Sequence, residues 1–272
     1  MSQQPPRAPR FPLALDQVGR SATPAKPREP LRPQRHLHEA ARDARAQTVP
    51  QGLGLDSALV RQRMVQRLRA EGIQCEPVFA AMAQVPRHAF VDTALAIQAY
   101  EDTSLPIGHG QTISKPSVVA RMIELAFGGA NARAQGQLGR CLEVGTGCGY
   151  QTALLAHLAR QVISVERLKP LFDKASANLS AWRLDHVRLV YGDGMLGHAP
   201  NAPYDTIIAA AGGDDLPEHW LTQLAVGGRL VAPMQRSGGR GQVLVVMDKS
   251  ERGCVRTEHE GVHFVPLKSG IL

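Results

Sequence analysis

Cys141-Leu-Glu-Val-Gly-Thr-Gly-Cys-Gly149 is the stretch that decides the fold, because a short apolar strand leads directly into three closely spaced glycines. Glycine lets the backbone turn sharply and approach a ligand closely, where a Cβ atom would obstruct it. The next residues, Tyr150–Leu158, have the composition of a helix. A strand, a glycine loop and a helix N-terminus together form a site for nucleotide-type ligands. We therefore expect such a site here.

The glycine spacing indicates which kind of nucleotide ligand the loop binds. The fingerprint of dinucleotide-binding proteins is G-x-G-x-x-G, and counted from Gly145 its third glycine falls on Tyr150. The chain instead has G-x-G-x-G, which is typical of S-adenosylmethionine-dependent methyltransferases. A glycine loop alone is weak evidence, so this prediction depends on residues elsewhere in the chain.

Two acidic residues support the prediction because they also follow predicted strands. Glu166 ends the second strand, 21 residues after Gly145, where a carboxylate can accept hydrogen bonds from both ribose hydroxyls. Asp193, between two glycines after the third strand, is placed to reach the adenine amino group. Either could be an ordinary surface or turn residue, but their joint placement favours an adenosine-type cofactor. The predicted cofactor-binding residues are Glu143, Gly145, Gly147, Gly149, Glu166, Asp193 and Gly194.

Alternating strands and helices from Leu138 onward predict an α/β fold with a parallel sheet covered on both faces. A polar stretch, Asp248–Gly253, joins the last two strands and predicts an antiparallel hairpin. The fold class is therefore a doubly wound, Rossmann-like methyltransferase sheet with a C-terminal antiparallel hairpin. The predicted strands are Arg140–Val144, Val162–Glu166, Val187–Tyr191, Tyr204–Ala209, Arg229–Pro233, Gln242–Met247 and Val262–Val265. Helices are expected near residues 150–159, 168–182 and 216–225.

The chain divides into an arm and one domain. Residues 1–54 hold nine of the nineteen prolines and few large apolar residues, which predicts a disordered arm. Residues 55–272 form the predicted methyltransferase domain, with a helical and substrate-side segment at 55–135 and the cofactor-binding sheet at 136–272. The segment begins with a helical cap, in which one helix is N-capped at Asp56-Ser57 and ended by Gly72, and a second covers Pro77–Gln84.

The positive charge is concentrated in the arm. Of the net charge of +7, residues 1–54 carry +5 and the remaining 218 residues only +2. A nearly neutral domain argues against nucleic acid as a partner. The arm is interpreted either as an electrostatic tether or as a solvated extension, and its composition favours the extension.

Cysteine, histidine and apolar patterns indicate the protein's environment. The four cysteines form no C-x-x-C pair, as is typical of reduced thiols in a cytosolic protein. No apolar run approaches the roughly 18 residues of a membrane span, and the N-terminus lacks the apolar core of a signal peptide. We therefore expect a cytoplasmic protein with no membrane segment. The ten histidines show no metal-ligand spacing, so no metal is predicted.

A second distinctive segment lies upstream of the glycine loop, Leu105-Pro-Ile-Gly-His-Gly-Gln-Thr-Ile-Ser-Lys-Pro116. It precedes a helix with regularly spaced apolar residues. From residue types alone, Thr112 and Ser114 are best explained as caps of this helix, and Ser114 is close to a first turn that Pro116 begins.

Taken together, Pro106–Ser114 and Leu142–Tyr150 resemble the protein-L-isoaspartate (D-aspartate) O-methyltransferase family, over about residues 57–267. The Gln-Thr-Ile-Ser element ending at Ser114 is the most family-specific part. The chain departs from the family at Cys148, where many relatives have serine, and at the turn Gly212–Asp215. Further matching elements are Val85-Pro-Arg87, Phe90-Val91, Tyr100-Glu-Asp102, Gly192-Asp-Gly194, Ala202-Pro-Tyr-Asp205, Gly227-Gly-Arg-Leu230 and Phe264-Val-Pro-Leu267.

The resemblance implies a protein repair enzyme. Such an enzyme transfers a methyl group from S-adenosylmethionine to the free carboxylate of L-isoaspartyl and D-aspartyl residues in damaged proteins and peptides. It implies catalytic roles for Ser114 and Thr112, and substrate binding by Ile113, Val265 and Leu267. A carboxylate with a pKa of about 4 is already ionised at pH 7, so the reaction needs no general base. Ser114 is then expected to orient the substrate and not to act as a covalent nucleophile.

Two alternatives remain. A methyltransferase of a small molecule or RNA would share the cofactor-binding half, but the resemblance of Gln111–Ser114 and Phe264–Leu267 to substrate-side elements of the repair family argues against it. A non-catalytic binding protein could keep the fold and act through its arm. The intact set of acidic residues and glycines at the predicted cofactor site argues against that.

Overall fold

A seven-stranded sheet forms the centre of the computed structural model, which describes residues 58–272. The strand order is β5-β4-β3-β6-β7-β8-β9. All pairs from β5 to β7 are parallel, whereas β7–β8 and β8–β9 are antiparallel. The strands are β3 (Arg140–Val144), β4 (Gln161–Glu166), β5 (Val187–Tyr191), β6 (Tyr204–Ala209), β7 (Leu224–Gln235), β8 (Gln242–Ser250) and β9 (Gly253–Val262). The predicted arm and the predicted N-cap at Asp56-Ser57 lie outside the described residues.

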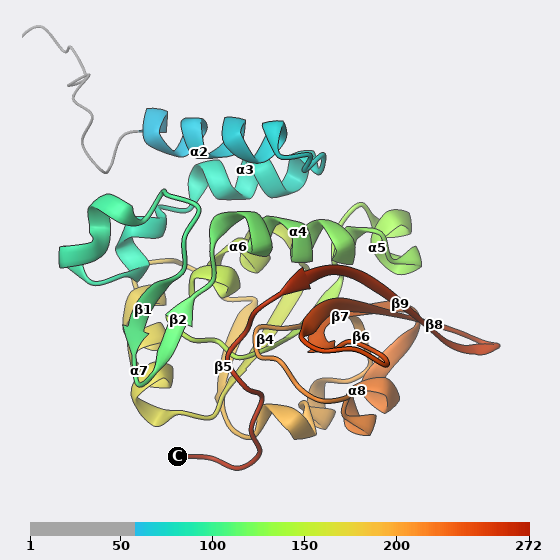
Figure 1. The fold of residues 1–272 in the computed structure, drawn as a ribbon. Helices are drawn as coiled ribbons and strands as arrows, with labels where there is room; N and C mark the ends of the chain where they lie inside the picture. The colour runs from blue at the N-terminus through green and yellow to red at the C-terminus, as the bar shows by residue number, and fades with distance from the viewer. Residues whose placement is uncertain (1–57) are drawn as a thin grey trace, which may run out of the picture. The chain divides into compact units, whose positions relative to one another are not determined.

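Helices cover both faces of the sheet (Figure 1). One face carries α4 (Pro116–Phe127), α6 (Tyr150–Leu158) and α7 (Lys169–Leu179), and α8 (Glu218–Gln223) packs on the other. The predicted helical cap is present as α2 (Ala58–Ala70) and α3 (Glu76–Gln84), which lie outside α4 and α6. The remaining helical elements are α5 (Ala130–Gln135) and the 3-10 turns η2 (Arg87–Phe90), η3 (Thr93–Gln98), η4 (Gly194–Leu196) and η5 (Ala199–Asn201).

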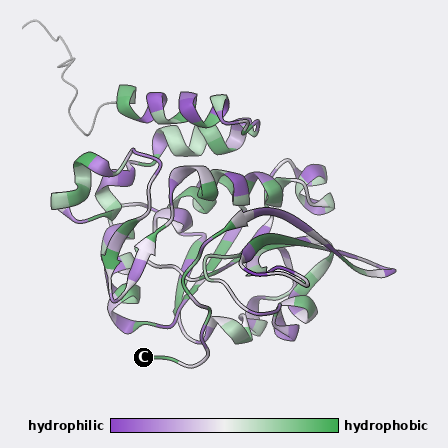
Figure 2. Cartoon of the chain, in the orientation of Figure 1, coloured by the Kyte–Doolittle hydropathy of each residue, from purple (hydrophilic) through white to green (hydrophobic). Residues whose placement is uncertain are grey.

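Burial on both faces explains why the central strands are apolar throughout. In β3, Cys141 packs into the cluster beneath α4 and α6, whereas Leu142 and Val144 pack on the opposite side with Trp220. All four side chains are almost completely buried. Parallel strands covered on both faces have this continuous apolar pattern. The helices show the same dependence on burial in the hydropathy colouring of Figure 2, because α3 is mainly hydrophobic while the outer helix α2 alternates between polar and apolar residues.

β3 lies at the point where the strand order reverses, since it pairs with β4 on one side and with β6 on the other. Ligands of open α/β sheets bind in the crevice at the carboxyl ends of the strands that flank such a point. The glycine loop follows β3 and Glu166 ends β4. The topology therefore brings the predicted cofactor residues to one edge of the sheet.

The structure corrects the predicted final strand. Val262–Val265 was expected to be that strand, but β9 occupies Gly253–Val262, and the connection is a tight turn at Glu251-Arg252. β9 is an edge strand that pairs only with β8 in the described sheet, and most of its side chains are exposed. Its polar composition therefore gives no apolar alternation, which is the signal from which strands are predicted.

The sequence also gave no indication of a small hairpin before α4. Strands β1 (Leu105–Gly108) and β2 (Gln111–Ile113) pair in antiparallel fashion. Their turn needs left-handed backbone at three successive residues, and His109 adopts it with φ 54° between two glycines. Because the strands are so short, no periodicity in the sequence could predict them. Among the described residues, no helix is long and apolar enough to cross a membrane.

Candidate active site

The glycine loop takes a shape that side chains would strain. Gly145, Gly147 and Gly149 have φ values of 90°, 59° and 89°, in the left-handed region that favours glycine. A Cβ atom on Gly147 would also come within 3.3 Å of Ile107 Cδ1, a residue of the β1–β2 hairpin. The loop borders a cavity of about 420 Å³, and two of its glycines, Gly145 and Gly147, line that cavity.

Glu166 lies on the wall of this cavity and fixes the loop. One carboxylate oxygen accepts a hydrogen bond from Gly147 N–H at 2.9 Å, and the other accepts one from Leu168 N–H at 2.9 Å. The side chain is almost fully buried. Each carboxylate oxygen can accept two hydrogen bonds, so both oxygens retain capacity for a ligand. The glycine cradle and this carboxylate fit the adenosine cofactor that the sequence predicts.

Glu143 lies beneath the loop and does not line the cavity. Its carboxylate accepts hydrogen bonds from Gln151 and Thr152 at the start of α6 and from Ser164 in β4. Ser164 in turn contacts the hydroxyl of Thr146 in the loop at 2.6 Å. Burial raises the pKa of Glu143 to about 7, although the three hydrogen bonds oppose the rise. Glu143 therefore supports the loop from below.

Asp193 and Gly194 follow β5, but only Gly194 lines the cavity. A Cβ on Gly194 would meet Val144 Cγ1 at 2.5 Å, so glycine is required there. The Asp193 carboxylate caps η4 by accepting from Met195 N–H at 2.9 Å, and its second oxygen accepts from Gly270 N–H at 2.6 Å. The expected adenine contact of Asp193 stays a prediction.

The C-terminal residues form a cavity wall that the sequence did not indicate. Leu272 lines the cavity, and its backbone hydrogen-bonds to Arg167 and Lys169, just after Glu166. The Arg167 side chain donates to the carbonyls of Ser269 and Gly270. No periodicity or motif marks residues 268–272, so only the folded structure brings them beside β4.

A second cavity, of about 900 Å³, adjoins the first. The two share four wall residues, Thr112, Ser114, Ala210 and Val265. Ile113 and Leu267, the other predicted substrate residues, line the first cavity only. The predicted catalytic residues therefore lie at the junction of the cofactor-side cavity with a larger space bordered by α4, β8 and the segment after β9.

The structure corrects the explanation of Ser114 as a helix cap. The N-cap of α4 is Lys115, and the first turn is held by Asp102, which accepts hydrogen bonds from both N–H and hydroxyl of Ser117. The Ser114 hydroxyl lies at the junction of the two cavities and makes no hydrogen bond within the described residues, so it is available to a ligand.

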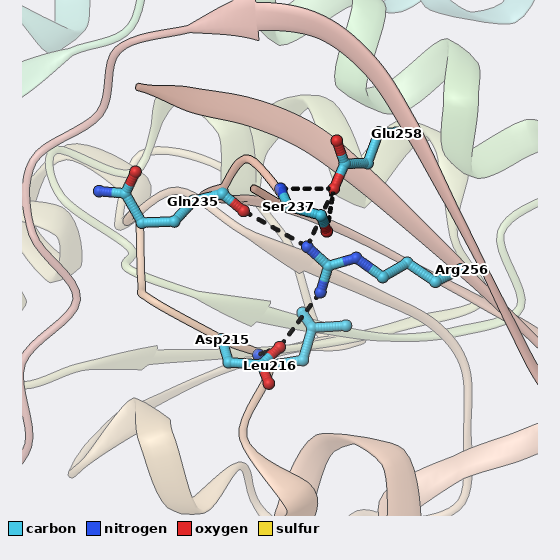
Figure 3. Close-up of polar contacts among 6 residues, drawn as sticks. All are labelled: Asp215, Leu216, Gln235, Ser237, Arg256 and Glu258. Carbon is cyan, nitrogen blue, oxygen red and sulfur yellow. Dashed lines mark hydrogen bonds and ion pairs between the residues drawn. The ribbon is translucent and has the colours of Figure 1, made fainter. Parts of the chain in front are cut away.

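Val265 is held in place by the turn after β6. Gly212 N–H donates to the Val265 carbonyl at 2.8 Å, and Leu267 N–H donates to the Gly212 carbonyl at 2.7 Å. A Cβ on Gly212, at this departure from the family pattern, would come within 2.3 Å of the terminal amide of Gln242, which would have to move. The end of the same turn is joined to β9, because Arg256 of that strand donates a hydrogen bond to Asp215 at 3.1 Å (Figure 3). Glu258, also in β9, accepts a second hydrogen bond from Arg256 at 3.4 Å.

Cys148, the other departure, lines the first cavity. Its side chain is buried, and burial raises the pKa of the thiol. Its backbone carbonyl accepts a hydrogen bond from Asn178. A buried thiol with a raised pKa has little thiolate character. In residues 58–272, no group of three or more His, Cys, Asp or Glu side chains is arranged to hold a metal ion.

Comparison with known proteins identifies the family. The model of the protein-L-isoaspartate(D-aspartate) O-methyltransferase family matches residues 59–271. The chain belongs to this family. A protein-L-isoaspartate O-methyltransferase from Methylibium petroleiphilum is 63% identical over 97% of each chain. Another from Leptothrix cholodnii is 56% identical over 98% of this chain and 96% of the relative.

Solved structures agree with this family assignment. A protein-L-isoaspartate O-methyltransferase superposes with a TM-score of 0.68 at 27% identity, covering 78% of this chain and 67% of the other. A putative enzyme of the same name from Plasmodium falciparum, in complex with S-adenosyl-L-homocysteine, gives 0.64 at 25% identity over 76% and 98% of the two chains. The predicted fold class and family are confirmed. The chain is a methyltransferase that uses S-adenosylmethionine.

Glu143 makes stability depend on pH. Its pKa is raised from 4.5 to about 7 in the folded state, so the folded protein holds a proton that the unfolded chain loses. Its contribution to stability is thus full below pH 4.5, falls as pH rises towards 7, and then levels off. We expect the melting temperature of the wild type to fall relative to Glu143→Gln between pH 5 and 8, by an amount equivalent to about 2 kcal/mol. Parallel melting curves across this range would contradict the buried, protonated carboxyl group.

Glu166→Ala should weaken binding of S-adenosylmethionine by well over tenfold, because two charge-assisted hydrogen bonds are together worth about 2–4 kcal/mol. Calorimetry on the folded variant measures this affinity. Glu251→Ala, in the exposed β8–β9 turn, is the matched control and should bind as the wild type does. Unchanged affinity in a folded Glu166→Ala protein would remove this carboxylate from the cofactor site.

Proposed function

We propose that this chain methylates the free carboxylate of L-isoaspartyl and D-aspartyl residues in proteins and peptides, and that Ser114 and Thr112 orient that carboxylate. The observation that carries the proposal is the junction of the two cavities at Thr112, Ser114 and Val265. One cavity has the glycine cradle and Glu166 on its wall, and the other has room for a peptide side chain and its neighbours. A carboxylate held at the junction would face the cofactor side.

The proposed reaction needs no general acid or base from the protein. S-adenosylmethionine supplies a methyl group on a positively charged sulfur. The carboxylate is ionised at pH 7 and is already nucleophilic. The chain's residues must therefore align the carboxylate oxygen with the methyl carbon and exclude water from two charges that cancel as they react. Hydroxyl groups at Thr112 and Ser114 suit the first task.

Separate residues serve the two ligands in this proposal. Glu166 binds the ribose hydroxyls, and Gly145 and Gly147 let the backbone approach the cofactor. Ile113, Val265 and Leu267 contact the peptide near its carboxylate. The backbone pairing of Gly212 with Val265 and Leu267 supports this assignment, because it fixes the segment against the turn after β6.

The location and the arm belong to the proposal as well. The cysteine spacing supports a cytoplasmic location, and the proposed reaction makes damaged proteins and peptides the partners. Cys141 and Cys148 are buried, and Cys254 is exposed. The composition of residues 1–54 supports an arm that takes no part in catalysis.

The test of this function compares two peptides of identical composition. One carries an isoaspartyl residue and the other its normal aspartyl twin, and both are incubated with the full chain and labelled S-adenosylmethionine. We expect label in the isoaspartyl peptide as a base-labile ester, and at least a hundredfold less in the twin. Equal labelling, or labelling of RNA or small molecules with none in the peptide, would support the alternative methyltransferase.

Ser114→Ala should lower the rate of peptide methylation about 10- to 100-fold and leave cofactor affinity largely intact. The loss is graded because a hydrogen bond to a charged group is worth up to about 3 kcal/mol, and Thr112 with the backbone still holds the substrate. Initial rates and calorimetry measure the two effects. Ser180→Ala, outside both cavities, is the control. Full activity of Ser114→Ala would remove the hydroxyl from catalysis, and complete loss with a trappable modified serine would indicate a covalent nucleophile.

A further inference from the structure

Arg87 is a buried cation with no ion pair in the described chain. It begins η2, and its side chain is fully inaccessible to solvent. Its hydrogen-bond acceptors are all backbone carbonyls, those of Ala99 at 2.7 Å, Ser114 at 2.8 Å and Thr103 at 3.5 Å. Asp102 acts on it only through longer-range electrostatics. Burial of a charge without an opposite charge is costly, and such cations are rare in proteins.

One end of the guanidinium is poorly satisfied. Arg87 Nη1 and the buried hydroxyl of Tyr150 beside it make no hydrogen bond of good geometry with any described group, and the phenol oxygen gives the guanidinium only a weak polar contact. The guanidinium carbon lies 4.9 Å from the centre of the Tyr150 ring, within the range of a cation–π contact. Burial lowers the pKa of Arg87 from its usual value, but an arginine stays protonated in proteins. The structure therefore maintains an uncompensated positive charge at this position.

The two groups that Arg87 contacts come from opposite sides of the site. Ser114 lies at the junction of the two cavities, and Tyr150 begins α6 directly after the last glycine of the cofactor loop. Both residues line the cofactor-side cavity. Arg87 itself lines neither cavity and stands behind both residues. Its position links the substrate-side loop to the glycine loop.

We propose that Arg87 is a positioning residue for methyl transfer, which fixes the Ser114 backbone against Tyr150 and places a positive charge behind the binding point of the substrate carboxylate. The inference rests on the proposed function, because it needs an anionic substrate at Ser114. A charge in a low-dielectric interior acts over several ångströms with little screening. Because Arg87 donates to the Ser114 backbone, the effect should fall mainly on an anionic peptide bound there, and S-adenosyl-L-homocysteine, whose sulfur carries no charge, should be little affected.

A purely structural role makes a different prediction. Arg87 also joins the end of η3 to α4 through Ala99 and Ser114, so its loss lowers stability under either interpretation. If that were its entire role, a variant that still folds would keep the wild-type KM for peptide. If Arg87 acts on the site, KM must follow the charge and the hydrogen-bonding capacity of the side chain.

Three substitutions separate these roles. Arg87→Lys keeps the charge and loses the planar fork, Arg87→Gln keeps a donor and loses the charge, and Arg87→Met loses both. Arg61→Met is the matched control, because Arg61 donates to the backbone carbonyl of Ala83 and lines neither cavity. Each variant is first checked by thermal melting and by calorimetry with S-adenosyl-L-homocysteine. KM and kcat are then measured on the isoaspartyl peptide.

We expect a graded series in KM. Arg87→Lys should raise KM three- to tenfold, and Arg87→Gln and Arg87→Met ten- to a hundredfold, while affinity for S-adenosyl-L-homocysteine changes less than threefold. A neutral variant that folds and keeps the wild-type KM would overturn the proposal. So would Arg87→Lys with wild-type KM and kcat, a result that decides the question even if the neutral variants do not fold. Failure of the wild type to methylate the peptide would instead refute the proposed function.

Discussion

The hydrogen bond from Gly147 N–H to the Glu166 carboxylate, 2.9 Å long, is the interaction on which the site depends. It joins the loop after β3 to the end of β4, and so converts two neighbouring strand ends into one cavity wall. The loop can accept this tether only because its glycines adopt left-handed backbone. Replacement of this carboxylate would therefore change the shape of the cradle as well as the proposed contact of Glu166 with the cofactor.

Beneath this tether, a buried polar network makes the loop a single rigid unit. The Glu143 carboxyl group accepts hydrogen bonds from residues of α6 and β4, and the Ser164 hydroxyl also contacts the Thr146 hydroxyl in the loop. Polar groups enclosed in an apolar core are costly unless all are satisfied, so this network specifies one arrangement of strand, loop and helix. The sequence contains the acidic residue before the glycines, but its role is apparent only when its partners in α6 and β4 lie around it.

Residues at the ends of parallel strands could be predicted from the sequence, whereas contacts between segments far apart in the sequence could not. Glu166 and Gly194 were predictable because parallel strands bring their carboxyl ends to one edge. Leu272 was not, because its place beside Arg167 depends on contacts across about a hundred residues that no local pattern encodes. β9 was misplaced because a polar edge strand has no buried face to impose alternation. Arg87 belonged to a recognised Val-Pro-Arg element, but composition cannot show that an arginine is buried without a counter-charge.

The buried charges around the site have opposite signs, and their arrangement matches the two ligands of the proposed reaction. The acidic side chain of Glu166 lies on the side of the glycine loop and lines the cofactor-side cavity. The buried cation, Arg87, lies behind Ser114 on the substrate side. Before the reaction, the cofactor is positive at sulfur and the peptide negative at its carboxylate, and methyl transfer neutralises both. In the proposed reaction, the Glu166 carboxylate would favour the cofactor on its side and Arg87 the peptide on the other, and the two ligands would meet at the junction between the cavities. In this proposal, removal of water from the junction lets the alignment of the two ligands, without acid–base catalysis, determine the rate.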